Sequence, residues 1–129
     1  MHNIFSSMHN TRTLLLLLLS VPFQLLAQTP SVSTNEAATI VTNSPTSISI
    51  GGNVTNQGGS AVIARGVVYT KSGTPTLGAT GTMATTDGTG TGVFTATLTA
   101  LDSGFSYNLR AYATNSSGTS YGPQRSFHT

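Results

Sequence analysis

Beyond its first 27 residues, the chain alternates apolar and polar positions in the way that is typical of β-strands. In residues 47–55, Ile48, Ile50 and Val54 fall on one parity, so an extended strand places them on one face. Residues 93–99 alternate in the same way. No stretch of this region has apolar residues at helical spacing over ten residues, so the pattern predicts strands.

Clusters of Gly, Pro, Asn and Ser divide this region at intervals of about 8 to 12 residues, which is the spacing of strands in a sandwich or barrel. The expected strands cover residues 38–42, 47–55, 62–70, 81–86, 93–99, 107–114 and 119–129. We therefore predict an all-β fold, a seven-stranded antiparallel Greek-key β-sandwich. The expected core residues are Ile48, Ile50, Val54, Phe94, Leu98, Tyr107 and Leu109.

The first 27 residues have the pattern of a signal peptide, which is expected to be helical. A polar segment with one charge, Arg12, precedes an unbroken run of leucines at 14–19, and the small residue Ala27 follows. Pro22 interrupts the apolar run well before the roughly 20 residues that a membrane span needs. We expect cleavage after Ala27, which makes Gln28 the new N-terminus and leaves no membrane span.

The chain is therefore expected to have three parts. These are a signal peptide over residues 1–27, a polar leader over 28–37 and one sandwich over 38–129. The expected location is the cell surface or the extracellular space. The periplasm is the alternative, because no sorting domain follows the sandwich in this sequence.

One segment of the sequence resembles part of a known protein family. Residues 101–107 have the spacing of a tyrosine corner, with Leu101 and Tyr107 as its structural residues: Tyr107 opens the sixth strand and bonds back to the backbone of the preceding corner. With the residues that follow, this segment resembles the F–G hairpin of fibronectin type III-like repeats, in the Thr/Gly-rich version found in secreted and surface proteins of bacteria. The resemblance covers residues 39–129, and its other segments are 47–55, 65–69, 86–94, 108–115 and 118–122.

The resemblance implies a fibronectin type III or immunoglobulin-like sandwich that serves as a spacer, adhesion module or scaffold. It implies no reaction, because sandwich folds carry many unrelated functions. The chain departs from the family pattern at two points. Ser103 stands where proline is common, and the chain has no tryptophan, so Tyr69 is expected to fill that part of the core.

The composition excludes several kinds of site. The chain has no cysteine, which excludes disulfides, thiol catalysis and cysteine-ligated metals. Its five Lys and Arg residues are dispersed, so no basic patch for nucleic acid is expected. After the signal peptide the acids are Glu36, Asp87 and Asp102, on separate segments, and they form no expected catalytic pair. His128 is the one histidine there, and no histidine is expected beside a serine as its base.

One surface is a candidate for contact with a partner. Arg110 and Tyr112 share the outward parity of the sixth strand, and Tyr121 approaches them from the last strand. Arginine beside tyrosine is common in protein interfaces. The alternative interpretation is that the three residues stabilise an exposed sheet face across the strands.

The expected function is that of an exported, non-catalytic structural or interaction module, without a cofactor. Its partner is an unidentified protein or glycan, and the module is expected to be monomeric and to stand next to further modules. Two alternatives stay open: a carbohydrate-binding module, which would need Tyr112 and Tyr121 exposed and coplanar, and a truncated unit of a longer tandem-repeat surface protein. Pairing of the expected edge strand at 38–42 with a neighbouring sheet is a further hypothesis.

Overall fold

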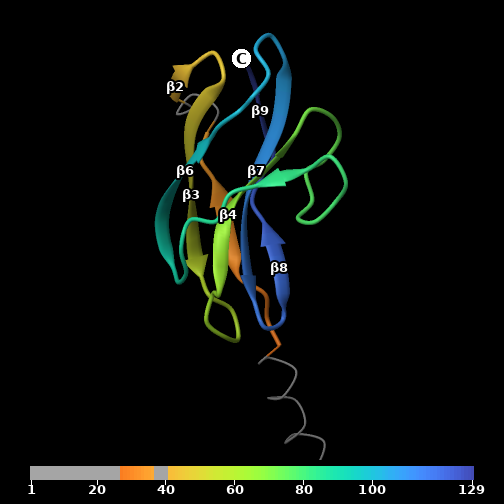
Figure 1. Cartoon of the computed structure of the whole chain (residues 1–129). Coiled ribbons are helices and arrows are strands. Elements are labelled where there is room, and N and C mark those ends of the chain that lie inside the picture. The colour runs from red at the N-terminus through yellow and green to blue at the C-terminus, as the bar shows by residue number, and fades with distance from the viewer. Residues whose placement is uncertain (1–26, 37–40) are drawn as a thin grey trace, which may run out of the picture.

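Two antiparallel sheets pack face to face in the computed structural model, which describes residues 27–36 and 41–129 (Figure 1). One sheet contains β1, β2, β3 and β6, and the other contains β4, β5, β7, β8 and β9. The strands are β1 (Ser31–Thr34), β2 (Val41–Ser44), β3 (Ser47–Asn56), β4 (Ala64–Thr70), β5 (Met83–Ala84), β6 (Gly92–Leu98), β7 (Ser106–Asn115), β8 (Gly118–Tyr121) and β9 (Arg125–His128). The predicted β-sandwich class is confirmed, and the predicted signal peptide lies outside the described residues except for Ala27.

The described part of the chain has nine strands, two more than the seven that the sequence predicted. Residues 31–34, which were expected to be a leader, form β1 and pair with β3. The expected last strand at 119–129 is divided into β8 and β9, and the expected strand at 81–86 is reduced to the two residues of β5. The first expected strand begins outside the described residues and continues as β2.

The division of the last strand has a physical cause in β1. The Gly122 N–H donates to Ala111 O at 2.9 Å, and the Thr34 hydroxyl accepts from Ala111 N–H at 2.9 Å. A Cβ on Gly122 would lie 2.6 Å from that hydroxyl oxygen, so only glycine leaves room for β1 here. Thr34 of the first sheet therefore bonds to β7 of the second sheet at the point where the last strand is divided into β8 and β9.

The core between the sheets contains all seven residues that the alternation predicted, and each of them is buried. Tyr69 is also buried, 6.5 Å from Tyr107 between ring centroids, so it fills the place expected of it. Phe127 stacks on the other side of Tyr107 at 5.4 Å. The Tyr107 hydroxyl accepts a hydrogen bond from Asp102 N–H at 2.8 Å, beside buried Leu101, which is the geometry of a tyrosine corner.

The burial of Tyr69 predicts a loss of stability at alkaline pH. Burial, and to a smaller extent the neighbouring Tyr107, raises the pKa of Tyr69 above its ordinary value of about 10. The neutral phenol is therefore favoured in the folded state. Its contribution to the free energy of unfolding is complete below pH 10 and is lost as the pH rises through the pKa of the folded state. We expect urea midpoints to be level from pH 7 to 9 and to fall above about pH 10.

The replacement Tyr69→Phe tests this assignment, because it removes the titrating group and keeps the ring. Its midpoints should fall less above pH 10 than those of the unchanged protein. The part of the decline that remains has a second source: the hydrogen bond to Asp102 raises the pKa of Lys71, whose contribution is lost in the same direction. Identical declines in both proteins would contradict the role of Tyr69.

The first and last described residues lie at opposite poles of the sandwich (Figure 1). The carbonyl of Gln28 accepts from Gly59 N–H at 3.0 Å and from Asn115 Nδ2 at 2.7 Å, at the end of β7. Thr129 bonds to both backbone groups of Phe105, just before β7 begins. The ten residues of β7 therefore separate the poles by about 30 Å.

Candidate functional site

A polar loop of twelve residues, 71–82, connects β4 to β5 and forms the largest irregular feature of the second sheet. It is rich in Thr, Ser and Gly, and most of its side chains are exposed. Pro75 is the exception, since it is fully buried against the sheet. The loop lies over the outer face of the second sheet, where Val68 and Tyr112 are buried although they point away from the core.

Side chains of the sheet fix the backbone of this loop at four points and the backbone just after β5 at a fifth. Asn108 Nδ2 donates to Gly73 O at 2.7 Å, and Arg110 Nε donates to Pro75 O at 2.6 Å. The other three bonds join Leu77 N–H to the Tyr121 hydroxyl (2.9 Å), the Thr70 hydroxyl to Gly81 O (3.2 Å) and the Tyr112 hydroxyl to Thr85 O (2.6 Å). Such bonds satisfy backbone groups that a loop would otherwise leave to water.

The three residues of the predicted partner surface therefore meet, but they face the loop of their own chain. Tyr112 is only 2% exposed. The Arg110 guanidinium lies 3.7 Å from the centroid of the Tyr121 ring and covers it. The expectation that Tyr112 points into solvent is corrected, because the loop covers this face, and no exposed coplanar pair of Tyr112 and Tyr121 forms.

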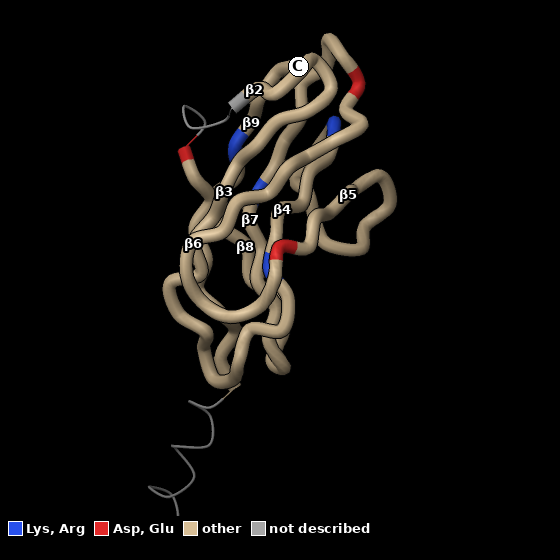
Figure 2. The backbone as a smooth tube through the Cα atoms, turned by 60° about the vertical axis from the view of Figure 1, so that its left-hand side comes forward, with Lys and Arg blue, Asp and Glu red and all other residues tan. Residues whose placement is uncertain are grey.

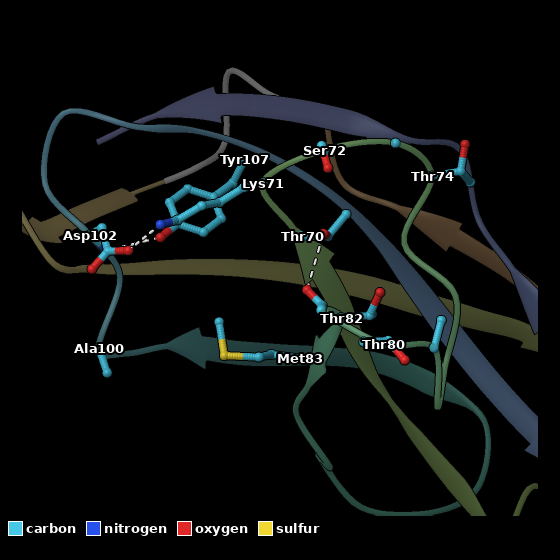
Figure 3. Close-up of a pocket in the computed structure, with 13 residues that line it drawn as sticks. Thr70, Lys71, Ser72, Thr74, Thr80, Thr82, Met83, Ala100, Asp102 and Tyr107 are labelled. Carbon is cyan, nitrogen blue, oxygen red and sulfur yellow. Dashed lines mark hydrogen bonds and ion pairs between the residues drawn. The ribbon is translucent and has the colours of Figure 1, made fainter.

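A groove of about 560 Å³ opens between this loop and the corner that follows β6 (Figure 3). Its lining includes five side chains with hydroxyl groups, which belong to Thr70, Ser72, Thr74, Thr80 and Thr82. Met83 adds an apolar side chain that is 45% exposed, and Ala100 forms part of the opposite wall with a positive φ of 54°. The groove thus offers both hydrogen-bonding groups and apolar contacts.

An ion pair occupies one end of the groove. Figure 3 shows Lys71 and Asp102 facing one another beside Tyr107, and Lys71 Nζ donates to Asp102 Oδ2. Lys71 Nζ also lies 4.0 Å from the centroid of the Phe105 ring, which is 49% exposed. Because the two charges cancel, the groove favours neither an anion nor a cation, and it presents a donor next to an acceptor.

The other two acids of the described chain, Asp87 and Glu36, also form hydrogen bonds or ion pairs. Asp87 Oδ2 accepts from the Thr85 hydroxyl at 2.6 Å, and the backbone N–H of Asp87 donates to Arg65 O at 2.7 Å. Glu36 Oε1 accepts from Arg125 Nη2 at 2.7 Å. Within residues 27–36 and 41–129, no group of three or more His, Asp or Glu side chains gathers in a form that would hold a metal ion.

One expectation about histidine was wrong. His128 does lie beside a serine, since its Nδ1 is 3.0 Å from the Ser106 hydroxyl oxygen across the β7–β9 pair. Pattern reasoning missed the contact because the two residues are far apart in sequence and meet only through strand register. Both side chains are exposed, and the hydrogen bond links neighbouring strands.

The groove itself was not predicted from the sequence. In the sequence Lys71 is one of five dispersed bases, and Asp102 is an acid on a segment of its own. The signal that was available is the run of Thr, Ser and Gly at 70–82, which is too long for a tight turn. What the pattern does not contain is the position of the corner at 100–102, which closes the groove from the far side.

Comparisons with known proteins agree with the architecture. No model of a protein family matches the chain, and no curated protein matches it. The third fibronectin III domain of human KIAA0343 protein is similar in structure, with a TM-score of 0.56, 15% identity and coverage of 80% of this chain and 85% of that one. The sensor domain of the anti-sigma factor RsgI4 of Pseudobacteroides cellulosolvens has a TM-score of 0.50, 19% identity and coverage of 78% and 93%.

These similarities define the fold as a fibronectin type III-like β-sandwich. At such low identity they show the fold alone. Among the residues that the structure describes, no helix has the length and apolar character that crossing a membrane requires.

Proposed function

We propose that the chain is an exported, non-catalytic interaction module that holds a polar partner in the groove between β4–β5 and the corner at 100–102. The observation that carries the proposal is the set of four hydrogen bonds that fix the backbone of the loop. A loop that is ordered before binding loses less entropy when a partner arrives, so its groove binds more tightly. Functional loops on rigid scaffolds are the usual binding elements of sandwich folds.

The lining of the groove limits the chemistry of the partner. Hydroxyl groups and a neutral ion pair suit an uncharged polar surface, such as a glycan or the backbone of a protein loop. Lys71 and Asp102 offer a donor and an acceptor side by side, which matches two neighbouring hydroxyls of a sugar. The partner classes are those expected from the sequence, an unidentified protein or glycan.

A binding screen tests the proposal. The protein is produced from its full-length gene in a bacterial host, and the purified product is applied to glycan and matrix-protein arrays at physiological salt. Thr80→Arg places a long charged side chain on the groove lining, whereas Ser117→Arg makes the same change in the distant β7–β8 turn. We expect Thr80→Arg to abolish saturable binding and Ser117→Arg to leave it unchanged.

A double replacement, Arg110→Ala with Tyr112→Ala, tests the role of the loop. It removes the Arg110 anchor of the loop and the Tyr112 bond to Thr85 O after β5, and it leaves the groove lining in place, so binding should weaken. Circular dichroism checks that the sandwich stays folded, because Tyr112 is buried. Binding that survives Thr80→Arg would place the contact elsewhere and overturn the groove. Mass spectrometry of the exported product tests the export, because cleavage after Ala27 leaves Gln28 first.

A passive spacer is the second candidate function, and it rests on a different observation. The two ends of the described sandwich lie at opposite poles, so consecutive modules would join head to tail without folding back. Absence of binding by a folded protein across both arrays would favour this function and the related possibility of a unit from a longer tandem array.

A further inference from the structure

The outer edge of β6 is open. Within the described part of the chain, β6 pairs with β3 and with no other strand. Its pairing with β3 runs without a bulge from Gly92 to Leu98. The N–H and C=O groups on its other side therefore form a regular row along an edge, which is a template for a further strand.

The other edges of the two sheets are interrupted. Both pairings along the opposite edge of β3, with β1 and with β2, contain register shifts. In the second sheet, β5 has only two residues, and the edge made by β8 and β9 is broken at 122–124, which includes Pro123. Short strands, bulges and proline are the usual protections of a sheet edge, and β6 has none of them.

The first sheet has no charge. Its four strands contain no Lys, Arg, Asp or Glu, and Figure 2 shows the tube without charged positions along β3 and β6. The outward side chains of β6 are Val93, Thr95 and Thr97, and all three are exposed. The strands of this edge therefore bring no like charges together between two copies. The nearest charge, the Arg65 guanidinium over the Phe94 ring, is bonded to the carbonyls of Gly90 and Thr91 of its own chain.

The sequence of β6 is also complementary to itself. Two copies that run antiparallel about a twofold axis at Thr95 overlap over the whole strand, so that Gly92 of one copy opposes Leu98 of the other. On the outer face Val93 then opposes Thr97, and on the inner face the large Phe94 opposes the small Ala96. β-branched pairs on an exposed face and large–small pairs on a packed face are favourable in antiparallel sheets.

We propose that two copies of this chain associate through their β6 edges, with Thr95 of each copy on the twofold axis, to form one continuous sheet. The interface is isologous, as in most homodimers, and main-chain hydrogen bonds supply its contacts. The proposal goes beyond the groove function. The lining of the groove contains no residue of β6, although its wall at 100–102 follows that strand directly.

Cysteine crosslinking tests the register, since the chain has no cysteine of its own. Residues that face each other across an antiparallel pair have Cα atoms about 4.5 to 5.5 Å apart, which is within reach of a disulfide. Thr95→Cys should therefore give a covalent dimer under mild oxidation. Thr97→Cys is the matched control, because in this register its two copies are about 13 Å apart, four residues along the strand. Equal crosslinking of both variants would overturn the proposal.

Sedimentation velocity over a range of concentrations tests the association itself, on the purified product of the full-length gene. The unchanged protein should show a monomer–dimer equilibrium. Thr95→Lys brings two like charges together at the axis and should raise the dissociation constant severalfold, up to about fivefold. Thr55→Lys places the same charge on the exposed end of β3, away from the edge, and should change nothing.

Circular dichroism of each variant shows whether the fold is intact, and the crosslinking result does not depend on the lysine variant. An unchanged protein that stays monomeric at every concentration would overturn the proposal, as would a dimer that Thr95→Lys does not weaken. Binding to the arrays is measured separately, so loss of the dimer and failure of the groove function are distinguishable.

Discussion

Replacing Gly52 with valine is expected to lower the free energy of unfolding by about 3 kcal/mol, which is a large part of the stability of a small domain. Gly52 lies in the middle of β3, at a point where the two sheets approach closely. A Cβ at this position would lie 2.8 Å from Ala111 Cβ on the opposite sheet and 2.8 Å from Phe94 Cζ. Neither neighbour can withdraw freely, because both are buried in the core.

Urea denaturation of the full chain measures this effect. The free energy of unfolding of Gly52→Ala should lie between those of the unchanged protein and Gly52→Val, because alanine adds the clashing Cβ without the two further methyl groups. Thr55→Val is the matched control on the same strand, since Thr55 is exposed and the change keeps its shape. Valine favours strands in general, so an unchanged or higher stability of Gly52→Val would show that the sheets are farther apart at this point.

Replacing Tyr107 with alanine is expected to destabilise the domain by about 3 to 5 kcal/mol, as is usual for a large aromatic residue in a core. Tyr107 is 2% exposed and lies between the rings of Tyr69 and Phe127. Its loss leaves a cavity between two rings that cannot close without moving β7 and β9. It also removes the hydroxyl that accepts the hydrogen bond from Asp102.

Tyr107→Phe separates these two effects, because it keeps the ring and removes only the hydroxyl. The partly buried N–H of Asp102 then loses its acceptor, and we expect a cost of about 1 to 2 kcal/mol in urea denaturation. A cost near zero for Tyr107→Phe would mean that water replaces the hydroxyl. Equal costs for the two replacements would mean that the stacked rings add nothing to stability.

Strand identity was accessible from the sequence wherever one face of a strand is buried. The alternation in β3 and β6 places their apolar residues on one face, and their burial follows from it. β1 was missed because it has only four residues and its one apolar side chain, Val32, gives no periodicity. The break between β8 and β9 was missed because its cause, the contact of Gly122 with Thr34, joins residues far apart in sequence.

The candidate site was less accessible, because parity separates the two faces of a strand but does not show what covers the outer face. Arg110 and Tyr112 have the outward parity that was assigned to them, yet the 71–82 loop bonds to Arg110 and the backbone just after β5 bonds to Tyr112. A loop folding back over a sheet leaves no periodic signal. The partner-contact role of these residues thus becomes a proposal about the loop that they hold.

The placement of residues 28 and 129 at opposite poles of the sandwich has a mechanical consequence. Tension applied between residues 28 and 129 pulls β1 toward one pole and β9 toward the other, each along its own axis (Figure 1). Hydrogen bonds between strands are perpendicular to the strands, so this force strains all the bonds of a ladder together in shear. When a force instead pulls two paired strands apart sideways, the hydrogen bonds between them break one at a time. The sandwich is therefore oriented to resist stretching along the line that joins its ends.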